Sequence, residues 1–246
     1  MWEVLHKSRW AETVRCGDVV RKYYFYHNTG KIEKEVSLLR LGTGLAVRLY
    51  YEPMTFRLVS EMPYIRLMPL FGGDTEDTLS QLADAFRMWD RDDRFLSMVE
   101  DDWDERTKPC LLRLLREYLP DDVDLQDYLV STRGEHFIHG DFQTSNVYRK
   151  EDGQLLVLDY ENAGTGPLLW DEATLAYSLI EQCEYAAAES VLQAFRCPGE
   201  MLACIAGIRL AQSKRKAENI ERRTTAYHYI LRHCRISASG EKEKLS

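Results

Sequence analysis

The order of apolar and polar positions separates a strand-rich beginning from a longer, helix-rich remainder. Residues 4–26 hold short aromatic and β-branched runs that break around Gly17, a pattern typical of two strands joined by a turn. In residues 30–41 apolar side chains recur at helical spacing, and Gly42 follows them. This pattern predicts a short amphipathic helix that ends at Gly42.

Two more β-rich stretches complete the strand-rich beginning. Residues 45–51 and 56–62 flank a turn that contains Pro53, whose ring presets φ. From about residue 74, and again over residues 171–235, leucine and other apolar side chains recur at helical spacing. The prediction is an α+β chain with a small β-rich lobe followed by a larger helical lobe.

A hairpin is predicted inside the helical region, between residues 137 and 159. Short apolar runs flank residues 150–154, a loop with hairpin composition. Asp141 and Asn146 precede that loop, and Asp159 ends the second apolar run. Phosphoryl transfer needs a carboxylate that orients the attacking hydroxyl and oxygen ligands for magnesium, so these three side chains are candidates for that chemistry.

Composition narrows the possible functions. The net charge of −8 argues against general binding of nucleic acid, which depends on Lys and Arg. No segment has the roughly 18 consecutive apolar residues of a membrane span, and the amino terminus lacks the apolar core of a signal peptide. The six cysteines are scattered and signal neither a zinc site nor a disulfide framework. We therefore expect a cytoplasmic protein without membrane or nucleic-acid partners.

The segment HGDFQTSN, residues 139–146, followed by LDYE, resembles the aminoglycoside phosphotransferase and choline kinase superfamily, small-molecule relatives of the protein kinases. The resemblance implies a two-lobed protein-kinase-like fold and transfer of the γ-phosphate of ATP or GTP to an alcohol. It implies that Asp141 is the catalytic base or orients the hydroxyl, and that Asn146 and Asp159 hold Mg²⁺. The expected domains are a nucleotide-binding lobe, residues 1–63, a catalytic and substrate lobe, residues 64–236, and a disordered tail, residues 237–246.

The small lobe contains candidates for the nucleotide-binding side chains of a kinase. Such a fold places a Lys on the third strand, where it pairs with the phosphates, and a Glu on the following helix, which orients that Lys. Lys22 and Glu35 occur in this order. Arg21 and Glu33 are alternatives, because a shift of one residue in a strand or a rotation of the helix is not resolved by sequence.

The adenine site is expected at the connection between the lobes. The segment FRLVSEMP resembles the hinge strand of the family and points to Glu61 and Met62, with residues 68–70 as an alternative. Residues 5–15, which would cover the nucleotide, contain no glycine-rich phosphate loop.

Three residues near the candidate site have other expected roles. His139 is interpreted as a buried residue that braces the loop. Asp171 opens a predicted helix, so we expect it to cap that helix or to brace the loop. Glu161 is considered as a second metal contact.

The sequence favours a small acceptor. Gly140 replaces the arginine that precedes the catalytic aspartate in protein kinases, and only eleven residues separate Asp159 from Asp171, too few to display a protein substrate. Residues 71–135 carry 18 acidic and 8 basic side chains, which suggests a positively charged acceptor. The alternative function is that of a catalytically silent relative that binds nucleotide or an assembly partner. The chain is expected to be a monomer or a homodimer.

Overall fold

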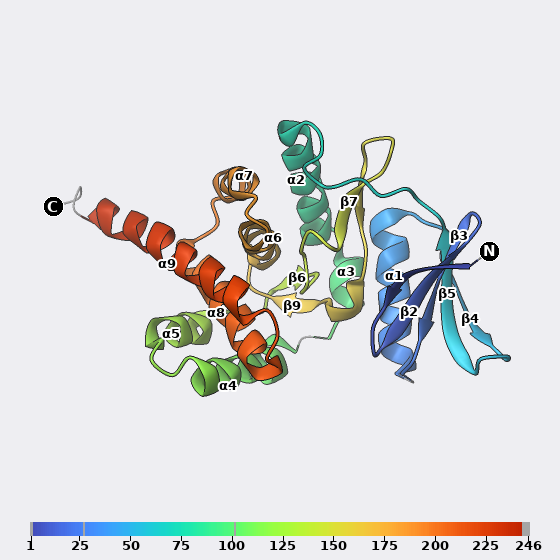
Figure 1. Ribbon diagram of the computed structural model, residues 1–246, viewed down its shortest axis with the longest axis horizontal. Helices are drawn as coiled ribbons and strands as arrows, with labels where there is room; N and C mark the ends of the chain where they lie inside the picture. The colour runs from blue at the N-terminus through green and yellow to red at the C-terminus, as the bar shows by residue number, and fades with distance from the viewer. Residues whose placement is uncertain (1, 27, 101, 243–246) are drawn as a thin grey trace.

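The structure is a computed structural model that describes residues 2–26, 28–100 and 102–242, with side chains described up to residue 233. Figure 1 shows a β-sheet with one helix at one end of the molecule and a group of helices at the other. The predicted α+β, two-lobed, protein-kinase-like fold is confirmed. The part of the chain covered by these residues has no helix long and apolar enough to cross a membrane.

The small lobe is a five-stranded antiparallel sheet in the order β1-β2-β3-β5-β4. Its strands are β1 (Trp2–Lys7), β2 (Ala11–Cys16), β3 (Val19–Tyr24), β4 (Arg48–Glu52) and β5 (Arg57–Pro63). The turn at Gly17, where φ is +61°, and the turn between β4 and β5 lie where the sequence predicts them.

The first predicted strand pair contains three strands rather than two. The missed break lies between β1 and β2, where the Ser8 hydroxyl accepts hydrogen bonds from the backbone N–H groups of Trp10 and Ala11, both at 3.1 Å. A serine side chain that binds its neighbouring backbone in this way closes a local turn. The break makes β3 the third strand, and Lys22 lies on it.

Helix α1 (Thr29–Thr43) follows the first three strands. The side chain of Asn28 caps its first turn by accepting the N–H of Lys31, and Gly44, with φ of +67°, ends it. The prediction that the helix ends at Gly42 is therefore wrong by two residues. Gly42 has another structural role, because a Cβ at this position would overlap the hydroxyl of Tyr160.

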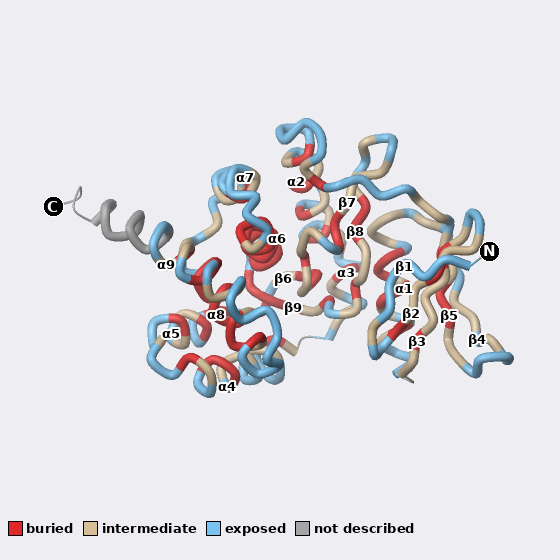
Figure 2. The backbone as a smooth tube through the Cα atoms, in the orientation of Figure 1, coloured by how far each residue is buried: buried red, intermediate tan, exposed pale blue. Residues whose placement is uncertain are grey.

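The helical lobe begins at Asp74, which caps α2. Its helices are α2 (Thr75–Arg91), α3 (Asp93–Ser97), η1 (Trp103–Thr107), α4 (Lys108–Tyr118), α5 (Val123–Ser131), α6 (Trp170–Glu181), α7 (Tyr185–Phe195), α8 (Gly199–Lys216) and α9 (Ile220–Lys242), with a short 3₁₀ turn η2 (Tyr160–Asn162). Figure 2 shows that α6 is buried almost throughout, with α8 beside it, so these two helices form the centre of the lobe.

The strands around the hairpin predicted in the helical lobe pair in another way than the sequence predicts. Strands β7 (Val147–Arg149) and β8 (Leu155–Val157) form the hairpin around residues 150–154. The first apolar run instead forms β6 (His136–Ile138), which pairs with β9 (Gly164–Gly166). The segment 139–146 is consequently a loop held between two small sheets, and a pairing across nearly thirty residues could not be read from local composition.

The end of the chain differs from the predicted disordered tail. Helix α9 includes residues 237–242, while residues 243–246 lie outside the described residues. No proline interrupts the segment after Arg235, so the backbone can continue the helix.

Candidate active site

The two lobes are joined by an ion-pair network around Lys22. Its Nζ lies 2.6 Å from Oε1 of Glu35 on α1 and 2.9 Å from Oδ1 of Asp159 in the helical lobe. Burial alone would lower the pKa of Lys22, but the carboxylates of Glu35 and Asp159 outweigh burial and raise it. Lys22 therefore stays charged at any physiological pH, and three residues predicted separately for the site are in direct contact.

The alternatives for this pair are resolved by geometry. Glu33 is exposed, whereas Glu35 is 4% exposed and faces the sheet. Arg21 points to the other face of β3, where its Nε lies 2.7 Å from Oε2 of Glu61. The lysine on the third strand thus pairs with Glu35, and Arg21 forms a separate cross-strand pair.

His139 and Asp171 hold the loop that contains Asp141. His139 is fully buried, with its Nε2 2.9 Å from the carbonyl oxygen of Leu158, and burial lowers its pKa. The carboxylate of Asp171 accepts the backbone N–H groups of His139 at 2.5 Å and of Gly140 at 3.1 Å. Asp171 is the second residue of α6, so the geometry is that of a brace on the loop.

Asp141 and Asn146 contact each other within the loop. The Asn146 side-chain nitrogen donates to the backbone oxygen of Asp141 at 2.9 Å and to its Oδ2 at 3.3 Å. Gln143 also donates to Oδ2, at 2.9 Å. The amide nitrogen of Asn146 is thus directed at Asp141, which leaves its Oδ1 available on the other side, where the Ser145 hydroxyl lies 3.4 Å away.

Asp159 has a left-handed backbone, with φ of +64°, which is uncommon for a residue with a side chain. The preceding Leu158 donates its N–H to the backbone oxygen of Asn146 at 2.8 Å, so the two predicted metal ligands are linked through the backbone. Glu161, in contrast, has its Oε1 2.9 Å from Nζ of Lys31 on α1. That ion pair directs Glu161 toward the small lobe rather than into a shared metal site.

Both segments predicted for the hinge lie in paired backbone. Glu61 and Met62 lie on β5, with the Glu61 side chain bound to Arg21. Met68 exchanges both of its backbone hydrogen bonds with Arg149 of β7, at 2.8 and 3.1 Å. Glu61 is paired with Arg21 of β3 and with Arg48 of β4, and Met62 with Val20 of β3, so both segments stay predictions for contact with a base.

Sequence reasoning missed Arg209. Its Nη2 lies 2.7 Å from Oδ1 of Asp141, and both side chains are about one-fifth exposed. Arg209 lies on α8, 68 residues after Asp141, and no local motif surrounds it. Only the packing of α8 beside the loop brings this guanidinium to the carboxylate.

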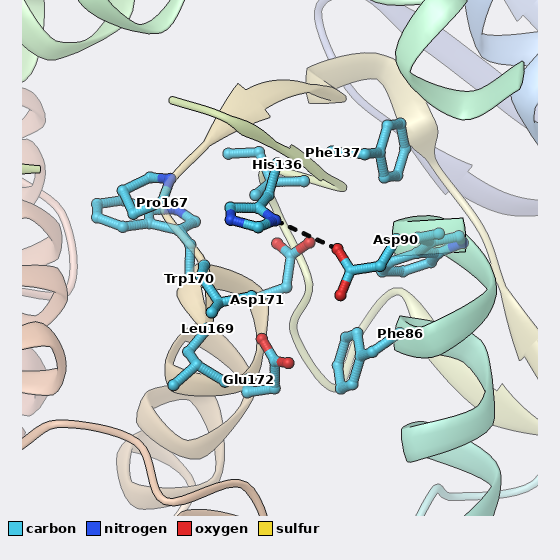
Figure 3. Close-up of a pocket in the computed structure, with 12 residues that line it drawn as sticks. Phe86, Asp90, His136, Phe137, Pro167, Leu169, Trp170, Asp171 and Glu172 are labelled. Atoms are coloured by element: carbon cyan, nitrogen blue, oxygen red, sulfur yellow. Dashed lines mark hydrogen bonds and ion pairs between the residues drawn. The ribbon is translucent and has the colours of Figure 1, made fainter. Parts of the chain in front are cut away.

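A pocket lies behind the loop, away from Lys22. Figure 3 shows Asp90 and His136 facing each other among the residues that line it, which also include Asp171 and Glu172. The Nδ1 of His136 lies 3.4 Å from Oδ1 of Asp90. Burial raises the pKa of Asp171 to about 8 and that of Glu172 to about 7. Asp171 lines this pocket and also braces the loop. The residues that line the pocket do not include Lys22 or its two partners.

Comparison with known proteins identifies the class. The model of the phosphotransferase enzyme family matches residues 66–202, more than half of the chain, and the chain belongs to this family. No curated protein matches the chain. The predicted resemblance to aminoglycoside phosphotransferases and choline kinases is confirmed.

Similar solved structures share the fold. A choline/ethanolamine kinase family protein from Mesorhizobium loti is 13% identical with a TM-score of 0.62, over 96% of this chain and 87% of that chain. A thermostable mutant of aminoglycoside phosphotransferase APH(4)-Ia, in complex with AMP-PNP and hygromycin B, is 14% identical with a TM-score of 0.66, over 95% and 93%. The amicoumacin kinase hAmiN, in complex with AMP-PNP, Ca²⁺ and Ami, is 12% identical with a TM-score of 0.61, over 93% and 86%.

The oxygen atoms of the site suit a magnesium ion that is held mainly by the phosphates of a nucleotide. Among the described residues, no cluster of three His, Cys, Asp or Glu side chains could hold a metal alone. Magnesium in kinase-type sites takes one or two protein oxygens and completes its shell with phosphates and water. Oδ1 of Asn146, which accepts one hydrogen bond from the Ser145 hydroxyl, and the half-exposed carboxylate of Asp159 meet that requirement.

Proposed function

We propose that this protein is a magnesium-dependent kinase that transfers the γ-phosphoryl group of ATP or GTP to a hydroxyl of a small molecule. The observation that carries the proposal is the convergence of Asp141, Asn146 and Asp159, with Lys22 and Glu35 completing the contact between the lobes. Phosphoryl transfer requires a carboxylate that orients the acceptor, metal ligands beside it and a lysine that binds phosphate, and these residues meet those requirements in the proposal.

In the proposed reaction, a bond forms between the acceptor oxygen and the γ-phosphorus while the bond from that phosphorus to the β,γ-bridging oxygen breaks. Asp141 accepts a hydrogen bond from the hydroxyl, orients its oxygen for in-line attack and receives the proton as the new bond forms. Asn146 and Asp159 would hold Mg²⁺, which neutralises charge on the phosphates. The products are the phosphate ester and ADP or GDP.

The small lobe would hold the nucleotide. Lys22, kept charged and oriented by Glu35, would bind the α- and β-phosphates. The backbone around Glu61 and Met62 would bind the base. In this proposal residues 1–63 are the nucleotide lobe and residues 64–236 the catalytic and substrate lobe.

The acceptor is proposed to be small because the segment between Asp159 and Asp171 is occupied by η2, β9 and the start of α6, which pack into the lobe. The positively charged acceptor suggested by composition stays a prediction, as do the cytoplasmic location and the monomeric or dimeric state. Retention of the whole ion-pair network argues against the catalytically silent alternative.

The thermal midpoint of unfolding with and without nucleotide tests the proposal. A ligand that binds only the folded state must raise the midpoint, so Mg·ATP or Mg·GTP should raise it and EDTA should reverse the effect. The same protein should then release ADP or GDP in the presence of an alcohol acceptor. If millimolar Mg-nucleotide leaves the midpoint unchanged, the kinase proposal is wrong and a nucleotide-independent binding role replaces it.

A further inference from the structure

Arg209 occupies one side of the carboxylate that is proposed to orient the acceptor. Oδ1 of Asp141 accepts the Nη2 of Arg209 at 2.7 Å, while Oδ2 accepts Gln143 and Asn146. Asn146 is the proposed metal ligand and contacts Oδ2, so Oδ2 is the oxygen nearer the proposed metal. Oδ1 and Arg209 lie on the other side of the carboxylate, the side left for the acceptor in this proposal.

A cluster of charged side chains on α6, α8 and α9 contacts Arg209 through its backbone oxygen. Its backbone oxygen accepts Nη1 of Arg223 at 3.0 Å. Nε of Arg223 lies 3.2 Å from Oε1 of Glu181, and Arg222 binds the same oxygen at 2.8 Å. We call Arg209, Arg222, Arg223 and Glu181 the arginine cluster.

Positive charge exceeds negative charge around this part of the site. The arginine cluster contributes three guanidinium groups and one carboxylate, and Asp141 adds a second carboxylate. In the described part of the chain, the side chain of Arg209 makes one hydrogen bond, to Asp141, so its Nε and Nη1 remain available. Nη2 has a second N–H besides the one directed at Asp141, and together with the N–H of Nε or of Nη1 it can bind an oxyanion through two parallel hydrogen bonds.

A buried hydroxyl with no partner lies beside the arginine cluster. Tyr177 on α6 is 2% exposed, and within the described residues its hydroxyl has no hydrogen-bond partner. The charges of Glu181, Arg223 and Arg209 all act on it. Buried polar groups are almost always hydrogen-bonded, so this unpaired hydroxyl, one turn of α6 before Glu181, points to a missing polar partner.

We propose that the acceptor carries an oxyanion, a carboxylate or a phosphate ester, close to its reactive hydroxyl, and that Arg209 binds this oxyanion. The proposal rests on the phosphotransferase function above. The oxyanion competes with Asp141 for the guanidinium and frees Oδ1 to accept the hydroxyl of the same molecule. An ammonium group would be repelled by Arg209, so this inference opposes the cationic acceptor predicted from residues 71–135.

A binding experiment tests the site without a known substrate. The protein is first saturated with Mg·AMP-PNP, so that the nucleotide site is closed to other anions. The thermal midpoint is then measured with sodium acetate and with sodium phosphate, each against sodium chloride at equal ionic strength. Acetate or phosphate should raise the midpoint of the wild type, and the rise should disappear in Arg209→Met and be reduced in Arg209→Lys.

The matched control is Arg87→Met. Arg87 is an exposed arginine of α2 that pairs with Asp84 at 2.8 Å, far along the chain from the loop and the arginine cluster. This variant should keep the full rise of the midpoint. The absence of any rise in the wild type, or an equal rise in Arg209→Met, would overturn the inference and leave Arg209–Asp141 as a structural ion pair.

The charge preference is tested with four acceptors built on one three-carbon skeleton. D-Glycerate and glycerol 3-phosphate carry an oxyanion, glycerol is neutral, and 3-amino-1,2-propanediol is cationic. Loss of a bidentate charge-assisted contact corresponds to a change of about 100-fold, so an oxyanion acceptor should exceed glycerol by that factor in kcat/KM. Arg209→Met should remove the preference, mainly through KM. Faster turnover of glycerol or of the amine than of both anions would contradict the inference.

The two proposals fail in different ways. If Mg·AMP-PNP does not raise the midpoint, the proposed kinase function fails. If Mg·AMP-PNP raises the midpoint but acetate and phosphate add nothing, the kinase function stands and only the oxyanion site is lost. If acetate gives the larger rise, the acceptor is a hydroxy acid, whereas a larger rise with phosphate identifies a phosphate ester.

Discussion

Gly42 of α1 packs directly against the hydroxyl of Tyr160, the residue that follows Asp159. A methyl group on Gly42 would overlap this hydroxyl, and Tyr160 is 1% exposed. The contact joins the helix that carries Glu35 to the segment that carries Asp159. The absence of a side chain at position 42 therefore allows α1 and the segment after Asp159 to pack this closely.

Substitution of Gly42 by alanine is expected to destabilise the protein by about 1–3 kcal/mol, the usual cost of overpacking a filled site. The expected cause is the Tyr160 hydroxyl, so Tyr160→Phe in the same chain should recover part of the loss in a double-mutant cycle. Gly30→Ala, also on α1, is the control, because a Cβ at position 30 would have its nearest neighbour, the side chain of Asn28, 3.9 Å away. Equal unfolding midpoints for Gly42→Ala and Gly30→Ala in urea would contradict this account.

Glu35→Gln is expected to lower kcat/KM by about 10- to 100-fold, because Lys22 loses one of its two charged partners and small displacements of a positioning group cost about this much. Glu33→Gln removes the same charge from the exposed face of α1 and should change little. Both variants are compared for nucleotide-dependent turnover at saturating Mg²⁺. An equal loss in the two variants would mean that the charge of α1, rather than the Lys22–Glu35 contact, affects catalysis.

Asp141→Asn should reduce kcat by about 10²- to 10⁴-fold, the range for removal of a general base, while Mg-nucleotide still raises the unfolding midpoint. Asparagine keeps the size of the side chain, so the loop should retain its shape. Asp84→Asn, an exposed substitution on α2, is the matched control. Retention of full turnover by Asp141→Asn would remove Asp141 from the catalytic role.

The contacts between candidate residues that the sequence could predict are those between positions close together along the chain. Asp141, Asn146 and Asp159 occupy one loop and the end of one hairpin, so their spacing alone indicates that they converge. Lys22 and Glu35 were identified by order along the chain, but the choice between Glu35 and Glu33 required the rotation of α1 about its axis.

The features that were missed depend on long-range packing or on single side chains. Strand β6 pairs with β9 rather than with its neighbour in the chain, and Arg209 reaches Asp141 from 68 residues away. The break after β1 depends on the hydroxyl of Ser8, which competes for backbone groups that would otherwise continue the strand. Hydrophobic periodicity reports burial of one face and contains no information about such contacts.

Glu172 links the pocket behind the loop to the pH dependence of stability. Its side chain is nearly buried, and Figure 3 shows its carboxylate near those of Asp171 and Asp90. Burial, with the charge of Asp90, raises the pKa of Glu172 to about 7 in the folded state from an ordinary value of 4.5. The folded protein therefore holds this proton more tightly than the unfolded chain does.

Because the pKa of Glu172 is raised by folding, its contribution to stability is complete below pH 4.5 and is lost as pH rises to about 7. The loss amounts to as much as about 3 kcal/mol. Glu172→Gln cannot ionise, so the variant should be more stable than the wild type at pH 7.5 and should lose less stability between pH 5 and pH 7.5. Urea unfolding at a series of pH values measures both effects, with the exposed Glu200→Gln as control. A parallel pH dependence for wild type and Glu172→Gln would show that Glu172 is already ionised in the folded protein, and the slope would then have to come from Asp171.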